Sequence, residues 1–385
     1  MTLGDATERL RNLLVGESDA DTAADATGAT ADATDATADA TDEASAGVRD
    51  RLPGVTRRSL LAGVLGVGAA KAADNVLVGY GILTGTNLQR QDVGALATER
   101  LQPSPFEVAL PAATVSLGAG ALSVDGDASD LGALSPSRGR ELDYERGLAG
   151  GGERERGPFE ELAADWNAIA GPADVTVRPT TRAAFFEDVA AADSRPFTVQ
   201  ALRGNKYHPA TPETVRAFAA VDPERPAAVV DGLMHGFNER TSYDVPRYVA
   251  GSVEDNVIFG AADLREHFQD PVTFDALLNQ NDSGMFCYEF VHRSIDALHA
   301  VPPHRQRNPV FAGVVTDKRH KHVYTVLASA YREDDELVLP ITFVDYTHST
   351  LYDDFAADVV LGDGVNAYDS RHRATDIYWN GYRAL

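Results

Sequence analysis

The sequence predicts an α+β fold for residues 158–385, with a helical half followed by an antiparallel β half. Two observations carry this prediction. Between residues 158 and 300 most apolar residues recur at helical spacing, whereas residues 309–344 form β-branched and aromatic runs separated by polar turns. Helices that precede strands, without alternating with them, are typical of an α+β domain.

The helical half begins with an amphipathic segment at 159–170, which ends at the stop signal Gly171-Pro172. A later segment starts with Thr211 and Pro212, residue types that favour the cap and the first position of a helix. The pattern predicts helices at 181–192, 211–220, 227–237 and 263–268, strands at 174–178 and 196–202, and an apolar segment at 272–278 that leads to the only cysteine.

That cysteine, Cys287, stands where a loop turns into a helix. Ser283 and Gly284 form a turn-like stretch, and apolar residues then recur at helical spacing up to Leu298. Unpaired N–H groups and the positive end of the helix dipole favour a thiolate at such a position. The alternative is that Cys287 is a small buried hydrophobic residue. A single cysteine excludes an intrachain disulfide and a zinc site with several cysteines.

The β half contains three predicted strands, at 309–315, 322–328 and 337–344. His322 opens the second strand, and Asp345 directly follows the third. The chain therefore presents, in this order, a cysteine at a helix start, a histidine on a strand and an aspartate at the end of the next strand.

Three short stretches in this part of the chain resemble the motifs of the transglutaminase-like superfamily of papain-fold enzymes. They are Gly284-Met-Phe-Cys287, His322-Val-Tyr324 and Val344-Asp-Tyr-Thr347, and the resemblance covers roughly residues 280–350. It implies a papain-like or transglutaminase-like domain that acts on a peptide or protein substrate through acyl transfer or amide hydrolysis. It implies neither a cofactor nor a metal ion.

The resemblance also assigns a role to each residue. Cys287 would attack an amide or thioester-like carbonyl, and His322 would take the thiol proton and pass it to the leaving amine. Asp345 would fix the orientation of the imidazole. Backbone N–H groups at the start of the cysteine helix, with Gln280 or Asn281 as side-chain candidates, would stabilise the oxyanion.

Two other classes of function stay open. A metal site could use His320, His322 and His348 with Asp345 or Asp353, because imidazole and carboxylate groups suit zinc, but no His-Glu-x-x-His helix supports it. A catalytically inactive binding or structural protein of the cell surface could keep the same fold. For the base we favour His322 over His320, because His322 immediately precedes the apolar strand.

The composition is strongly acidic. The chain has 58 Asp and Glu against 34 Lys and Arg, a net charge of −24, and only four lysines. Such a surface suits a halophilic protein that stays soluble in concentrated salt. It also argues against nucleic acid as a partner, because phosphate binding needs a basic patch.

The first half divides into three predicted parts. Residues 1–55 form an acidic, low-complexity tail that we expect to be disordered, because it offers too little apolar surface to order itself. Residues 56–85 contain a signal-like or hydrophobic segment. Residues 86–157 are rich in Gly, Pro and Ser, and we expect an irregular region there that ends in a linker at 135–157.

The signal-like segment resembles a twin-arginine export signal. Arg57 and Arg58 precede an apolar run at 60–70, which is too short to span a bilayer, and Ala70-Lys-Ala72 offers a small-residue cleavage site. We expect export to the cell surface or exterior, with transient translocase or membrane contact through residues 56–85. The alternative is a buried helix in a cytoplasmic protein.

Overall fold

In the computed structural model, the described residues lie between 93 and 379. The larger gaps in this range are 251–271 and 348–373, and the shorter ones are 111, 119–120, 127–134, 150–155, 172–173, 194–195, 205–206, 245–246, 248–249, 281–282 and 318–321. Every element below belongs to the compact unit formed by Asp74–Asp244 and Gln269–Leu385. The predicted tail, the signal-like segment and the predicted helix at 263–268 lie outside the described residues.

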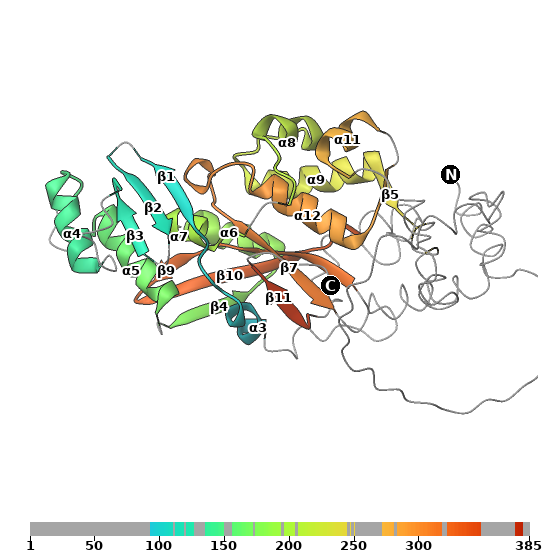
Figure 1. The fold of residues 1–385 in the computed structure, drawn as a ribbon. Helices are drawn as coiled ribbons and strands as arrows, with labels where there is room; N and C mark the ends of the chain where they lie inside the picture. Colours follow the sequence, from blue (N-terminus) through green and yellow to red (C-terminus); the bar gives the residue numbers. More distant parts are fainter. Residues whose placement is uncertain are drawn as a thin grey trace, which may run out of the picture. The chain divides into compact units, whose positions relative to one another are not determined.

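A mixed sheet forms the centre of this unit, and its strand order is β11-β7-β8-β10-β4, with β9 paired to β10 (Figure 1). β4 runs parallel to β10, and the other pairs are antiparallel. The strands are β4 (Val175–Pro179), β7 (Phe311–Asp317), β8 (His322–Ala328), β9 (Tyr331–Glu333), β10 (Glu336–Val344) and β11 (Asp376–Tyr378). The α+β prediction agrees with this mixture of helices with antiparallel and mixed sheets.

Both faces of the central sheet are covered. Along β8, Val323 and Leu327 belong to one apolar core, whereas Tyr324 and Val326 belong to another. Successive strand residues point to opposite faces, so these two cores lie on the two sides of the sheet. This explains why every residue of β8 is buried and why apolar residues stand on both faces of the strand.

One core is built mainly from the helices that surround the predicted nucleophile. These are α6 (Arg182–Ala191), α8 (Pro212–Ala219), α9 (Pro226–Arg240), α11 (Phe274–Asn279) and α12 (Cys287–Leu298). Three of them begin at a threonine whose hydroxyl accepts a backbone N–H three residues on: Thr181, Thr211 and Thr273. The predicted helices at 181–192, 211–220 and 227–237 are therefore confirmed, with local cap chemistry setting two of their starts.

The other core includes residues of α3 (Val93–Glu99), α5 (Pro158–Ala170) and α7 (Pro196–Leu202). The strand predicted at 196–202 is wrong, because this segment is the helix α7. Val199 and Leu202 are fully buried, and their spacing of three places both on one helical face. A short apolar run fits a helix or a strand equally well by pattern, and packing against the sheet decides between them here.

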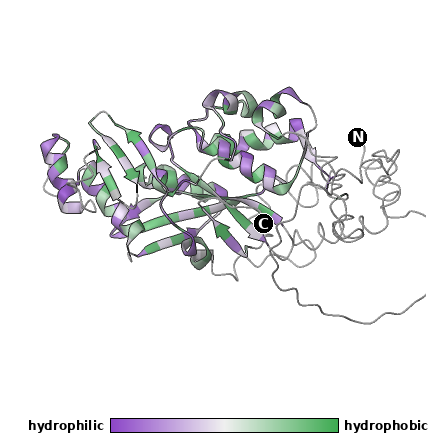
Figure 2. Cartoon of the chain, in the orientation of Figure 1, coloured by the Kyte–Doolittle hydropathy of each residue, from purple (hydrophilic) through white to green (hydrophobic). Residues whose placement is uncertain are grey.

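A second sheet lies in the region expected to be irregular. Its antiparallel strands are β1 (Phe106–Ala109), β2 (Thr114–Gly118) and β3 (Ala121–Val124), and they pack with α4 (Pro136–Glu145) and α5. Figure 2 shows apolar and polar residues alternating along these strands. The linker expected at 135–157 is also wrong in part, because α4 occupies its first half. The Asp143 carboxylate accepts the N–H groups of Phe159 and Glu160, each at 3.0 Å, and so caps α5.

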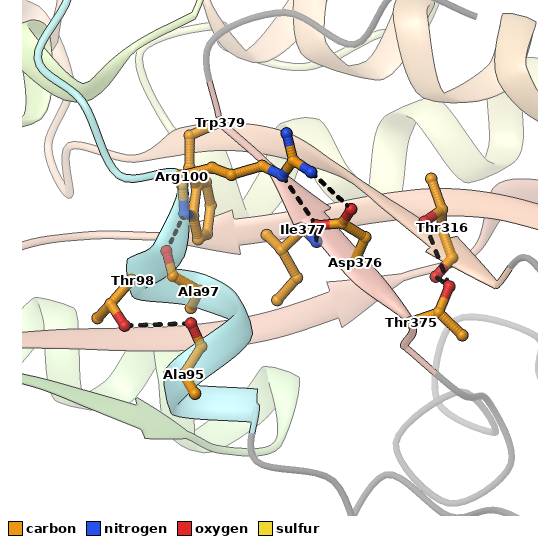
Figure 3. A network of polar contacts seen from close by, with 9 residues as sticks. All are labelled: Ala95, Ala97, Thr98, Arg100, Thr316, Thr375, Asp376, Ile377 and Trp379. Carbon is orange, nitrogen blue, oxygen red and sulfur yellow. Dashed lines mark hydrogen bonds and ion pairs between the residues drawn. The ribbon is translucent and has the colours of Figure 1, made fainter. Parts of the chain in front are cut away.

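The two ends of the described chain meet at the edge of the central sheet (Figure 3). Arg100, just after α3, forms two hydrogen bonds of 3.1 Å with the Asp376 carboxylate on β11. The Trp379 indole N–H donates to the Ala97 carbonyl at 2.5 Å. α3 therefore holds β11 in place against β7.

Two short strands lead into the predicted site. β5 (Thr241–Tyr243) and β6 (Ser283–Met285) pair in parallel, and α12 begins two residues after β6. A 3₁₀ turn, η6 (Pro303–Arg305), follows α12 before β7. Of the helices described, none has both the length and the apolar character needed to cross a membrane.

Candidate functional site

Cys287 is the first residue of α12 and is partly buried. The preceding Phe286 is in an extended conformation (φ −99°, ψ 164°), so the chain turns sharply into the helix at the cysteine. The Glu289 carboxylate accepts the Phe286 N–H at 2.6 Å, which satisfies one of the free donors of the helix start. The helix start predicted from the sequence is confirmed.

His322 and Asp345 meet at one end of the central sheet. His322 opens β8 and Asp345 follows β10, and these strands are antiparallel neighbours with Thr325 opposite Val344. The start of one strand therefore lies beside the end of the other. The His322 Nε2 atom is 2.8 Å from Asp345 Oδ2, and the two side chains are 7% and 1% exposed.

The environment of His322 favours its protonated form. Burial lowers the pKa of the imidazole, but the Asp345 charge and its hydrogen bond raise it, as do a hydrogen bond and a charge interaction with Cys287. The net effect raises the pKa of His322 from 6.5 to about 10. His322 thus interacts with both Asp345 and Cys287, the two other residues that the sequence singles out.

A buried side-chain contact fixes α12 on the strand that carries His322. The hydroxyl groups of Ser294 and Thr325 are 2.7 Å apart, and both residues are fully buried. Ser294 lies two turns after Cys287, and Thr325 lies three residues after His322. This contact therefore sets how the cysteine end of the helix is placed against the sheet.

An ion pair further along α12 holds neighbouring parts of the chain. The Arg293 guanidinium lies 2.7 Å from the Asp296 carboxylate, and both side chains are at most 1% exposed. The Asp296 carboxylate also accepts the backbone N–H groups of Tyr207 and His208, at 2.7 Å and 3.0 Å. Arg293 donates to the Val272 carbonyl at 3.2 Å. The helix is thus anchored on two sides by charge-assisted hydrogen bonds.

The remaining predicted site residues are placed only in part. Gln280 follows α11 and is exposed, and its side-chain oxygen accepts the Ser283 hydroxyl at 3.2 Å. The other oxyanion candidate, Asn281, lies outside the described residues. So do His320, His348 and Asp353, on which the alternative metal site depends. Within the part of the chain that is described, no three His, Cys, Asp or Glu side chains form a group able to hold a metal ion.

Sequence reasoning missed Glu289 and the Ser294 contact. A glutamate three residues after a helix cap is a recognisable signal, but it is usually read together with a Ser or Thr cap, and Phe286 stands there instead. The contact between Ser294 and Thr325 joins residues 31 positions apart and has no local signature.

Comparison of the chain with protein-family models, with curated proteins and with solved structures found no match.

Proposed function

We propose that this protein catalyses cysteine-dependent acyl transfer or hydrolysis of a peptide or amide, in a domain of the papain-like, transglutaminase-like type. One observation carries the proposal. The buried His322 is hydrogen-bonded to the Asp345 carboxylate at 2.8 Å, and the same imidazole interacts with Cys287, the only thiol in the chain. A nucleophile, a base and a residue that orients the base form the minimal set for such chemistry.

Each residue would act at a definite atom. Asp345 binds the His322 Nε2 atom, which leaves Nδ1 as the ring nitrogen for the thiol. In the reactive form His322 already holds the thiol proton as an imidazolium, the Cys287 thiolate attacks the carbonyl carbon, and a tetrahedral oxyanion forms. The C–N bond then breaks, the amine departs with the proton from His322, and an acyl-enzyme remains. Water or a second amine attacks this thioester and releases Cys287.

The raised pKa of His322 suits this sequence of steps. The ring must hold the thiol proton until the leaving amine can accept it, and the Asp345 charge stabilises the imidazolium during that interval. Asp345 is fully buried, so water screens this interaction little.

The start of α12 offers the oxyanion site. The first N–H groups of a helix have no acceptor within the helix, and Cys287 is the first residue. The Phe286 N–H already donates to the Glu289 carboxylate. The Cys287 N–H is therefore the next backbone donor along the helix start that could bind the oxyanion. The Gln280 amide is the side-chain candidate, because its oxygen already accepts a hydrogen bond and its NH₂ group is the part free to donate.

The setting of the reaction is part of the proposal. The acidic, lysine-poor composition supports a halophilic protein, and Arg57 and Arg58 before a short apolar run support twin-arginine export to the cell surface or exterior. A peptide or protein substrate is proposed, with neither a cofactor nor a metal ion.

The test begins with the reactivity of the single thiol. Iodoacetamide should modify wild-type Cys287 rapidly at neutral pH, because a cysteine that serves as nucleophile must reach the thiolate readily. The His322→Ala variant should react more slowly. Thr98→Ala, an exposed change on α3 far along the chain, is the matched control and should react like the wild type.

Activity against a casein or amine-acceptor substrate completes the test. Cys287→Ala and His322→Ala should each abolish turnover, and the double variant should resemble either single variant, because residues that act as one unit do not lose activity additively. Slow modification of the thiol that does not depend on His322, together with no turnover by the wild type, would end the proposal and favour a catalytically inactive binding protein. Full activity of Cys287→Ala would also end it, because the activity would then not depend on the thiol.

A further inference from the structure

A cavity of about 350 Å³ lies at the other end of α12 from Cys287. Its walls come from β1 and the residues before it, from the end of α7, and from the segment that follows α12. The helix between the cysteine and this cavity has 12 residues, which corresponds to a length of roughly 18 Å. The cavity is therefore separate from the proposed catalytic site.

Arg203 lines this cavity and is only 6% exposed. Its guanidinium donates to the Val301 carbonyl at 2.7 Å, to the Val310 carbonyl at 2.9 and 3.1 Å, and to the Gln306 side-chain oxygen at 2.5 Å. All of these acceptors are neutral. A guanidinium carries five N–H groups, so one N–H, on Nη1, is not used by these four contacts.

This buried cation has no carboxylate partner among the described residues. Burial lowers the pKa of Arg203 to about 9, and no negative charge offsets that effect. Charged side chains are rarely buried unless they are paired with an opposite charge, because desolvation is costly. A carboxylate that entered the cavity would supply the missing partner.

The cavity wall also carries one carboxylate. Glu107 lies on β1 between the buried residues Phe106 and Val108, and its side chain is exposed. No ion pair joins Glu107 to Arg203 in the described part of the chain. The wall thus presents a buried positive charge and a separate, exposed negative charge, together with apolar surface from Val108 and Ala109.

We propose that this cavity binds a small zwitterion, such as a free α-amino acid, with its carboxylate on Arg203 and its ammonium group at Glu107. The Glu107 carboxylate in the same wall supports a ligand of this class over a simple anion, because it would attract an ammonium group and repel a second negative charge. Apolar wall next to the two charges leaves room for a short side chain.

Isothermal titration with three probes at one fixed high ionic strength tests this proposal. Glycine carries both charges, acetate carries only the negative one, and methylammonium carries only the positive one. Glycine should bind about two- to fivefold more tightly than acetate, the range expected when one exposed ion pair is added. Glycine and acetate should compete, and methylammonium alone should bind weakest.

Variants identify the cavity without removing Arg203, whose contacts also hold the fold. Glu107→Gln should reduce the affinity for glycine to that for acetate. The control, Glu99→Gln, removes the same charge from an exposed position on α3 and should leave the affinity for glycine unchanged. Ala109→Leu places a larger side chain in the cavity from an exposed position and should abolish binding with an unchanged circular dichroism spectrum.

Cys287→Ala should bind glycine like the wild type, so failure of the catalytic proposal does not decide this one. The zwitterion site would be overturned if no probe binds, if acetate binds as tightly as glycine, or if Glu107→Gln leaves the preference for glycine intact. Binding of glycine that survives Ala109→Leu would also overturn it.

Discussion

The contact between His322 and Asp345 should make the stability of this protein depend on pH in a definite direction. A buried histidine whose pKa is raised binds its proton more tightly in the folded state than in the unfolded chain. Below pH 6.5 the histidine is protonated in both states, and the stabilisation is complete. Between pH 6.5 and about 10 only the folded state keeps the proton, so the stabilisation is lost as the pH rises.

The size of this effect follows from the shift itself. The pKa of His322 rises from 6.5 to about 10, and each pH unit of difference corresponds to about 1.4 kcal/mol. The free energy of unfolding should therefore fall by an amount on the order of 5 kcal/mol over this interval. That loss is large beside the total stability of a typical domain, about 5–15 kcal/mol.

The assay is urea denaturation at constant high salt, in steps from pH 6 to pH 10. Asp345→Asn removes the charge that chiefly opposes the effect of burial on His322, so this variant should be less stable at pH 6 and should lose little more by pH 10. Cys287→Ala keeps the His322–Asp345 pair and should retain most of the decline. A flat wild-type profile, or an equally steep one in Asp345→Asn, would refute the reasoning.

Three further changes test other parts of the molecule. Glu289→Ala should lower the free energy of unfolding by about 1–2 kcal/mol in denaturation experiments, because the partly buried Phe286 N–H at the helix start loses its acceptor, while Glu289→Gln should lose less. Gly313→Ala should cost about 1–3 kcal/mol in the same assay, since a Cβ there would lie 2.6 Å from the Tyr378 carbonyl oxygen. Replacing Arg57 and Arg58 with lysine should retain the protein inside the cell in a fractionation experiment; unchanged export would remove the signal hypothesis.

Local chemistry made much of the fold predictable. The strand predicted at 322–328 matches β8 in full, because its β-branched and aromatic residues favour a strand and a polar turn precedes it. The Thr211 cap located the start of α8 to within one residue, and the start of α6 likewise lies one residue from its predicted position. The position of Cys287 at a helix start was predictable in the same way. Ser283 and Gly284 indicate a turn, and the apolar residues after them recur at helical spacing.

Segments whose structure depends on distant partners could not be predicted. In β2 and β3, Val115 and Leu122 are buried in alternation with polar residues, but each strand has only four or five residues between turn-forming ones. An alternation of apolar and polar residues over so few positions is difficult to recognise in a stretch that is rich in Gly and Asp. The pairing of His322 with Asp345 was likewise only an expectation from order along the chain, because the strand register that brings them to 2.8 Å is a property of the assembled sheet.

The contact between α3 and β11 has a consequence for how the chain folds. Arg100 and Asp376 are 276 residues apart in sequence, so this part of the sheet closes only after Asp376 has left the ribosome. Until then β7 presents an unpaired edge, the kind of surface on which strands of other chains can pair. Such long-range closure slows folding, because the loop entropy is lost before the contact forms. During synthesis, we expect the edge of β7 to be a surface that a chaperone would protect.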